Sequence, residues 1–229
     1  MSITLAFDVY GTLIDTQGVS GLLRGMIGDA AESFALRWRD KQLEYSFRRG
    51  LMRHYVDFAT CTAQALDWCC EALGQDLGPD QRRILLEAYR TLPAFPDAAP
   101  ALTRLAARGL RLYAFSNGTR AAVETLLQAA GLREHFLDVV SVDEVKSFKP
   151  DPAVYAHFLR RAGATGEAAW LISGNPFDVL GARSAGMHAA WVRRSPTAVF
   201  DPWDLAPDLT VPGLEALADA FEDRAQPGP

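Results

Sequence analysis

Four short polar segments carry the residues of this sequence that could do chemistry. Three of them directly follow an apolar run, and the other lies in the loop after another such run. The first segment is DVYGT at residues 8–12, which follows the apolar run 3–7. A carboxylate at the tip of a buried strand can act as a nucleophile and split one displacement into two steps through an ester or acyl phosphate. An aspartate beside a glycine turn can also do no more than accept backbone hydrogen bonds. Asp8 is therefore a candidate nucleophile, with a turn-forming aspartate as the alternative.

The second segment, SNG at residues 116–118, is a candidate anion site. It follows the run 110–115, and Thr119 opens a helical pattern directly after it. Ser116 and Asn117 offer side-chain donors, and the N–H groups at a helix start bind anions. Ordinary N-capping by Ser, Asn and Thr is the alternative.

The third segment, FKPDP at residues 148–152, holds a lysine next to a proline. Lys149 precedes Pro150, and Asp151 is placed to cap a helix that has Pro152 at its first position. Tyr155 falls in the first turn of that helix. A lone lysine is usually solvated, but a lysine on a proline-rigidified loop points in a defined direction. We therefore treat Lys149 as a candidate site residue.

The fourth segment, residues 173–178, follows the run 168–172 and contains a further carboxylate. Asn175 is placed to cap a helix, and Asp178, three residues later, fits the glutamate position of a capping box. Each of the four segments is ambiguous by itself. Their common position after apolar runs predicts that they meet in one site.

Strands and helices that alternate along the chain would position these segments. Apolar runs predict buried strands at residues 3–7, 110–115, 136–141, 168–172 and 189–192, and helical patterns occupy residues 97–108, 119–130, 151–162 and 176–185. Such alternation is typical of a parallel sheet with right-handed crossovers and helices on both faces. We therefore expect an α/β fold with the polar segments at the carboxyl ends of its strands.

Residues 16–93 interrupt this alternation with helical patterns at 30–55, 60–73 and 79–92. Open α/β sheets bind ligands at the carboxyl ends of their strands, and the excursion begins at the tip of the first strand. We predict that 16–93 form a helical cap domain, inserted into a core of residues 1–15 and 94–222, with a frayed tail at 223–229. A helical buttress without a role in binding is the alternative.

The composition excludes several classes of protein. The chain has 229 residues, of which 49% are hydrophobic, so it can bury a sizeable core, and its net charge of −5 argues against a nucleic-acid partner. No run approaches the ~20 apolar residues of a membrane span, and the first residues lack the basic start of a signal peptide. Three cysteines without paired spacing form neither a disulfide framework nor a zinc pattern. We therefore predict a cytoplasmic protein with no membrane partner.

The four segments, in this order, resemble the motifs of the haloacid dehalogenase superfamily, whose members share a Rossmann-like core and an aspartate nucleophile. Most members are magnesium-dependent phosphotransferases with a second aspartate two residues after the nucleophile and an acidic metal ligand in the fourth motif. Here those places hold Tyr10 and Asn175, and Asp178 is the only carboxylate of the fourth motif. Magnesium prefers carboxylate and phosphate oxygens, so we expect neither a metal nor another cofactor.

Within the superfamily, the chain is similar to L-2-haloacid dehalogenases up to about residue 200. The segment WRDKQLEY at residues 38–45 is the most specific part of the match. The resemblance implies a Rossmann-like parallel sheet core with an inserted helical cap domain. It also implies metal-independent hydrolysis of short L-2-haloalkanoic acids to D-2-hydroxy acids. Asp8 would attack carbon 2 and expel halide, and water would then hydrolyse the aspartyl ester.

The resemblance also implies roles for individual residues. The catalytic group would be Asp8, Thr12, Arg39, Lys149, Tyr155, Ser173, Asn175 and Asp178. Asp178, positioned by Ser173 and Asn175, would polarise the water, and Arg39 with Asn117 would stabilise the departing halide. The substrate would be bound by Tyr10, Leu43, Phe58, Ser116, Asn117 and Phe177.

Helical spacing gives Arg39 a second argument. Its neighbours Leu36, Leu43 and Phe47 form an apolar stripe that would face the core if residues 16–93 are a cap. A cation in such a stripe is costly unless it meets an anion. An arginine that snorkels from a packed face is the alternative.

Two other functions stay open at this point. A magnesium-dependent phosphatase of the same superfamily would lose activity to a chelator, and a catalytically silent binding protein on this fold would release no halide. The partners we expect are a small 2-haloacid and water. Relatives in the family are often homodimers, so the resemblance implies a second copy of the chain as a partner.

Overall fold

A six-stranded parallel sheet forms the centre of the computed structural model, which describes residues 3–224. Its strands are β1 (Thr4–Phe7), β2 (Arg111–Ser116), β3 (Asp138–Ser141), β4 (Ala169–Ser173), β5 (His188–Val192) and β6 (Leu209–Val211). The strand order is β3-β2-β1-β4-β5-β6, and β1 pairs in parallel with both β2 and β4. Strands β2 and β3, which follow β1 in the sequence, lie on one side of it, and the later strands β4, β5 and β6 lie on the other side. The tips of β1, β2 and β4 therefore border a topological switch point, where α/β sheets bind ligands.

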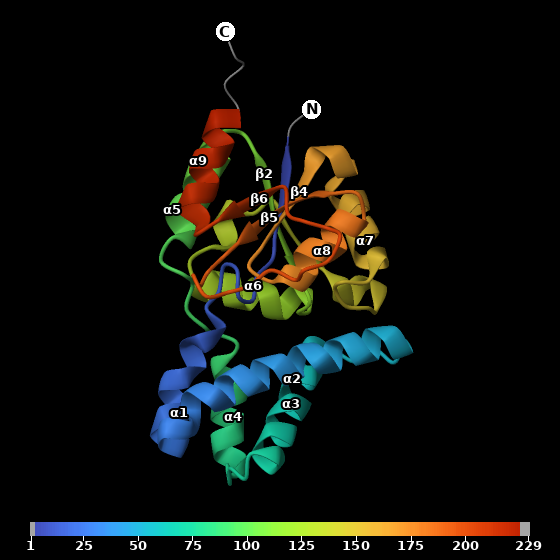
Figure 1. Cartoon of the computed structure of the whole chain (residues 1–229). Helices are drawn as coiled ribbons and strands as arrows, with labels where there is room; N and C mark the ends of the chain where they lie inside the picture. The colour runs from blue at the N-terminus through green and yellow to red at the C-terminus, as the bar shows by residue number, and fades with distance from the viewer. Residues whose placement is uncertain (1–2, 225–229) are drawn as a thin grey trace.

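Helices cover both faces of the sheet because its strands bury apolar side chains on both sides. Along β2, Leu112 and Ala114 belong to one apolar cluster, whereas Tyr113 and Phe115 belong to the other. The first face is covered by α5 (Ala98–Ala107), α6 (Arg120–Ala129) and α9 (Leu214–Arg224), and the second by α7 (Pro152–Ala162) and α8 (Pro176–Ser184) (Figure 1). The α/β fold with a parallel sheet is confirmed.

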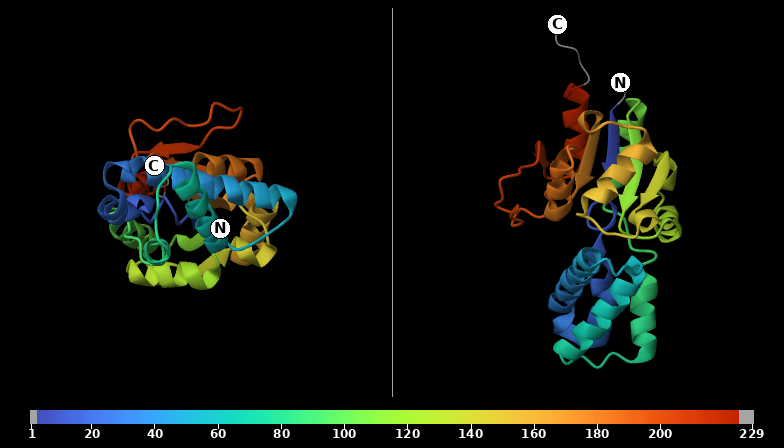
Figure 2. Two further views of the ribbon diagram at one scale, coloured as in Figure 1. Left: turned by 90° about the horizontal axis from the view of Figure 1, so that it is seen from below. Right: turned by 90° about the vertical axis from the view of Figure 1, so that its right-hand side faces the viewer.

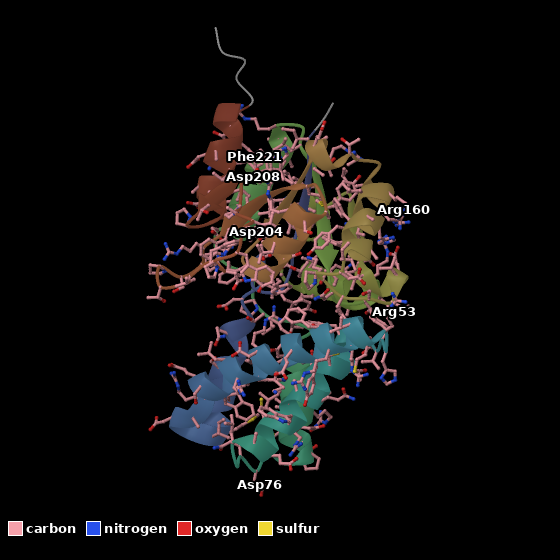
Figure 3. The ribbon with its side chains drawn as sticks, turned by 45° about the vertical axis from the view of Figure 1, so that its right-hand side comes forward. Arg53, Asp76, Arg160, Asp204, Asp208 and Phe221 are labelled. Carbon is pink, nitrogen blue, oxygen red and sulfur yellow. The ribbon has the colours of Figure 1, made fainter. Side chains whose placement is uncertain are left out.

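A separate group of helices lies beyond the carboxyl ends of the strands (Figures 1 and 2). It consists of α1 (Ser20–Ile27), α2 (Ala31–Met52), α3 (Phe58–Ala72) and α4 (Pro79–Ala88). The helices pack around the fully buried side chains of Phe34, Trp38, Leu66 and Leu85. In Figure 3, Asp76 marks the end of this group that is remote from the sheet, and Arg53 marks the end of α2 that lies beside the core.

Two adjacent connections join this helical group to the core. Phe95 donates its backbone N–H to the carbonyl oxygen of Leu13, and Asp15 donates to that of Pro93, each at 2.9 Å. Ile14 and Ala94 form an isolated antiparallel bridge between them. The inserted helical cap is confirmed as part of the fold, and its boundaries at residues 16 and 93 stay a prediction.

The structure differs from the sequence-based assignment at several elements. Predicted helix 30–55 ends at Met52, because Arg53 adopts a left-handed conformation with φ 53°. Helix α1 was not predicted, since its residues 20–27 include two glycines, and the three-residue edge strand β6 is too short to show a period. Helix α9 extends to Arg224, two residues into the predicted tail, and residues 225–229 lie outside the described residues.

None of the helices in the described part of the chain has the length and hydropathy needed to cross a bilayer. Cys61, Cys69 and Cys70 are buried and unpaired. Burial raises the pKa of Cys61 and Cys69 to about 11, so these thiols stay protonated and pack as small apolar side chains.

Candidate active site

Asp8 stands at the tip of β1 with only 6% of its surface exposed. Its Oδ2 accepts hydrogen bonds from Thr12 Oγ1 at 2.8 Å, from Asn175 Nδ2 at 2.7 Å and from Ser173 Oγ at 3.4 Å. Its Oδ1 accepts one hydrogen bond, from Lys149 Nζ at 3.1 Å. The carboxylate is therefore held in place through Oδ2, and Oδ1 is the oxygen with more capacity left to react.

Close approach of two loops holds Thr12 and Ser173 in this arrangement. The backbone N–H of Gly174 donates to Thr12 Oγ1 at 2.8 Å. A Cβ atom at position 174 would lie 2.4 Å from the carbonyl oxygen of Gly11, so only glycine fits there. The turn after Asp8 requires glycine as well, because Gly11 has φ +84°.

Lys149 is buried between two carboxylates, with 1% of its surface exposed. Its ammonium donates to Asp8 Oδ1, to Asp178 Oδ2 at 2.8 Å and to the carbonyl oxygen of Phe115 at 2.8 Å, which uses all three N–H groups. Burial acts to lower the pKa of Lys149, but the charges of Asp178 and Asp8 outweigh this effect and raise it. Lys149 therefore stays charged and stabilises both carboxylates.

Asp178 is fully buried, and its partners differ from those expected. Tyr155 donates its hydroxyl to Oδ1 at 2.8 Å, and Lys149 donates to Oδ2. The prediction that Ser173 and Asn175 position Asp178 is wrong, because both side chains donate to Asp8 instead. Burial raises the pKa of Asp178 to about 6, although Lys149 acts to lower it.

The side chain of Asn175 forms hydrogen bonds within the site instead of capping helix α8. It precedes α8 at the N-cap position, yet its side chain makes no capping hydrogen bond. Its Nδ2 donates to Asp8 and, at 3.0 Å, to the carbonyl oxygen of Tyr10. Both partners are acceptors, which fixes the amide nitrogen on their side. A capping box between Asn175 and Asp178 is therefore excluded.

Arg39 is the charged residue that the helical group contributes. Its Nη1 donates to Gln42 Oε1 at 2.6 Å, and its Nη2 donates to the carbonyl oxygen of Tyr10 at 3.3 Å. Burial lowers the pKa of Arg39, while Tyr89 and Asp8 act in the opposite direction. The guanidinium thus lies within electrostatic range of Asp8, as expected for a site residue on a cap.

The apolar stripe proposed around Arg39 is only partly present. Leu36 is 56% exposed, so it does not face the core. The buried face of α2 instead includes Trp38, Gln42 and Ser46. Arg39 shares a helix face with Ala35, four residues before it, and Gln42, three residues after it, and both are buried.

Ser116 and Asn117 lie buried at the tip of β2. Ser116 Oγ accepts the backbone N–H of Gly118 at 3.1 Å, and Asn117 Oδ1 accepts the backbone N–H of Lys149 at 3.0 Å. Asn117 therefore also fixes the loop that carries Lys149. Its Nδ2 end is the part of the side chain that can donate to an anion.

The four apolar or aromatic residues predicted to bind substrate do not share one cavity. Tyr10 and Phe58 pack with ring centroids 5.7 Å apart and line a cavity of about 190 Å³, together with Gly118 and Thr119. Phe177 instead packs against Phe47 of α2 at 4.9 Å. Among the described residues, the lining of this cavity includes neither Leu43, which is partly buried on α2, nor Phe177.

The donors around Asp8 do not fit a magnesium ion. Lys149 Nζ already occupies the space between the carboxylates of Asp8 and Asp178, and Oδ2 of Asp8 faces the N–H of Asn175. Magnesium would require oxygen ligands in these places. Within residues 3–224, no three His, Cys, Asp or Glu side chains gather into a metal-ligating group.

Sequence reasoning missed two residues that contact this site indirectly. Gln42 accepts a hydrogen bond from Arg39, and Thr62 contacts Gln42. The three-residue spacing between Arg39 and Gln42 on one helix could have revealed the first contact. The second joins α2 to α3, so only the tertiary structure shows it.

Comparisons with known proteins identify the family of this chain. The model of the haloacid dehalogenase-like hydrolase family matches residues 4–186. The chain is 37% identical over 221 residues to the (S)-2-haloacid dehalogenase of Pseudomonas sp. (strain YL), covering 96% of this chain and 95% of that relative. It is 34% identical over 213 residues to haloacetate dehalogenase H-2 of Moraxella sp. (strain B), covering 93% and 95%.

A solved structure extends the similarity to three dimensions. The L-2-haloacid dehalogenase from Xanthobacter autotrophicus with chloropropionic acid covalently bound superposes with a TM-score of 0.91 at 32% identity, covering 98% of this chain and 100% of that one. The chain therefore belongs to the haloacid dehalogenase-like hydrolase family.

Proposed function

We propose that this protein is an (S)-2-haloacid dehalogenase, which hydrolyses short L-2-haloalkanoic acids to D-2-hydroxy acids through an ester on Asp8. The observation that carries the proposal is the asymmetry of the Asp8 carboxylate. Three side-chain donors hold Oδ2, while Oδ1 meets only Lys149. The relatives named as (S)-2-haloacid dehalogenases and the structure with covalently bound chloropropionic acid support the same reaction.

In the first step, Oδ1 of Asp8 forms a bond to carbon 2 of the substrate as the carbon–halogen bond breaks. The halide leaves with the bonding electron pair, on the side of carbon 2 opposite Asp8. Arg39 supplies positive charge for the halide, because neither of its partners in the structure is a carboxylate. The donors at Ser116, Asn117 and the start of α6 hold the substrate carboxylate.

In the second step, water attacks the Cγ atom of the Asp8 ester and transfers a proton to Asp178. The bond between Cγ and the product oxygen then breaks, and the product takes up the proton from Asp178. The Asp8 carboxyl now holds the hydroxyl of the water, and it loses its remaining proton to solvent, which restores the carboxylate. Carbon 2 takes part in one displacement only, so its configuration is inverted. Thr12, Ser173 and Asn175 stabilise the charge that develops at Oδ2.

The direct test is halide release from the two enantiomers of 2-chloropropionate and from fluoroacetate. We expect release from the L enantiomer with a D-2-hydroxy acid as product. Equal rates for both enantiomers would contradict the proposed stereochemistry. The absence of halide release from every 2-haloacid would favour a binding protein on this fold.

Chelation is expected to leave turnover unchanged. The cation between the two carboxylates is Lys149, and magnesium does not fit beside it. Halide release should therefore have the same kcat with and without EDTA. Loss of turnover in EDTA with recovery on addition of magnesium would instead assign the metal-dependent chemistry of the wider superfamily.

A pH dependence follows from the role of Asp178 as base. Its carboxyl must be ionised to accept a proton, and burial raises its pKa to about 6 while Asp8 is charged. The Asp8 ester carries no charge, so kcat should fall as the pH drops below that value. The hydrogen bond from Tyr155 lowers the pKa of Asp178. Tyr155→Phe should therefore move the acidic limb of kcat to higher pH, by about half a unit to one unit. A limb that stays in place would contradict Asp178 as the base.

We also propose that the chain works as a homodimer in the cytoplasm. The three unpaired buried thiols support a reducing compartment. The dimer rests on the family resemblance. Light scattering on the purified chain would test it, and a mass of 25.0 kDa in solution would contradict it.

A further inference from the structure

A chain of hydrogen bonds runs from the interior of the helical group to Arg39. Thr62 of α3 donates its hydroxyl to the carbonyl oxygen of Phe58 at 2.8 Å. Gln42 of α2, with no exposed surface, donates its Nε2 to Thr62 Oγ1. Its Oε1 accepts Nη1 of Arg39 at 2.6 Å. Trp38 braces the same turn of α3 by donating its Nε1 to the carbonyl oxygen of Thr62 at 2.9 Å.

The direction of this chain is fixed by chemistry. The carbonyl oxygen of Phe58 can only accept a hydrogen bond, so the Thr62 hydroxyl donates its one proton to it. Thr62 Oγ1 must then accept from Gln42, which turns the amide nitrogen of Gln42 towards Thr62. The amide oxygen of Gln42 therefore faces Arg39, and no other orientation satisfies all three groups.

These hydrogen bonds hold the Arg39 side chain in place without neutralising its positive charge. Among the described residues, the hydrogen-bond partners of the Arg39 side chain are a neutral amide oxygen and a backbone carbonyl oxygen, and it forms no ion pair with a carboxylate. The nearby cations of α2 differ, because Lys41 and Arg48 both pair with Glu44. A glutamate in place of Gln42 would keep the shape of the side chain but place a negative charge at hydrogen-bond distance from Arg39.

We propose that Gln42, held by Thr62, is a positioning residue. It orients the Arg39 guanidinium towards the departing halide and leaves the positive charge of Arg39 available to that halide. This inference rests on the proposed function, in which Arg39 stabilises the halide. Neutrality at position 42 is the essential property, since a buried carboxylate there would compete with the halide for Arg39.

The test uses Gln42→Glu, with Gln64→Glu as the matched control. Gln64 lies exposed on α3, and its Oε1 accepts from Arg49 at 2.9 Å, so the control makes the same charge change beside an arginine on the outer face. Gln42→Glu should lower kcat by about tenfold or more and raise the inhibition constant of added bromide by a similar factor. Gln64→Glu should change neither value by more than about twofold.

If Gln42→Glu does not fold, a second pair of variants tests the hydrogen bonds that run from Thr62 through Gln42 to Arg39. Thr62→Val removes the hydroxyl with little change of shape and should weaken bromide inhibition, whereas Thr62→Ser keeps the hydroxyl and should restore it. Bromide inhibition that is unchanged in both Gln42→Glu and Thr62→Val would overturn the inference.

The proposed function fails in a different way from the positioning role. If Arg39→Gln abolishes halide release while Gln42→Glu and Thr62→Val match the wild type, the function stands and the positioning role is wrong. If Arg39→Gln itself keeps wild-type turnover and bromide inhibition, the proposed role of Arg39 falls, and the inference falls with it.

Discussion

Replacing Asp8 with asparagine is expected to abolish halide release, with a loss of kcat on the order of 10⁴-fold or more. The amide has the shape of the carboxylate but lacks its nucleophilic charge, so the bond to carbon 2 does not form. The fold should persist, because Lys149 keeps its second carboxylate, Asp178, at 2.8 Å. Halide release under saturating L-2-chloropropionate measures the effect, with the melting temperature as the control for folding.

An oxygen-labelling experiment separates this mechanism from direct attack by water. The product oxygen at carbon 2 comes from Asp8 in the two-step mechanism. In a single turnover in ¹⁸O-labelled water, with enzyme in excess, the hydroxy acid should therefore carry unlabelled oxygen at carbon 2, and the label should appear in Asp8. Label at carbon 2 of the product in the first turnover would rule out the ester.

Replacing Lys149 with methionine is expected to damage both activity and stability. The substitution leaves Asp8 and Asp178 buried together with no cation between them, and breaking a buried pair in this way costs about 3–5 kcal/mol. One of the two carboxyls will take up a proton to avoid the repulsion, which removes either the nucleophile or the base. Halide release should therefore fall by on the order of 10³-fold or more.

The pH dependence of stability distinguishes this electrostatic effect from lost packing. Without Lys149, the pKa of Asp178 rises further because the cation that lowers it is gone, so the folded state gains stability as the pH falls and a proton binds. The loss in free energy of unfolding, measured by urea denaturation, should be larger near pH 8 than near pH 5. Lys146→Met, at an exposed lysine that pairs with Asp143 at 2.9 Å, is the matched control and should show little change at either pH. A pH-independent loss in Lys149→Met would show that packing alone is responsible.

Charge balance explains why the site suits an anionic substrate without a metal. Two carboxylates, Asp8 and Asp178, lie near two cations, Lys149 and Arg39. Lys149 is saturated by hydrogen bonds, whereas Arg39 is held by neutral groups. The site can therefore accept a halide at Arg39 without losing the cation that keeps the nucleophile in place.

The sequence by itself determined the α/β fold and the order of the four polar segments. Both follow from local patterns, since short apolar runs that alternate with capped helices imply a parallel sheet, and parallel strands present their carboxyl tips on one edge. Asp8, Lys149 and Asp178 could therefore be assigned to one site before their distances were known. Elements without a strong period, such as α1 and β6, escaped prediction.

Only the tertiary structure decided which side chains form hydrogen bonds with one another. Asn175 and Asp178 fit a capping box by spacing, yet the folded chain brings Asp8 within 2.7 Å of Asn175 and Lys149 within 2.8 Å of Asp178. A buried charge gains more from a charged or amide donor than a solvated helix end gains from its cap, so these long-range contacts outweigh the local motif. The relay from Thr62 through Gln42 to Arg39 is likewise a product of packing between two helices, because no spacing within one helix can specify a partner on another.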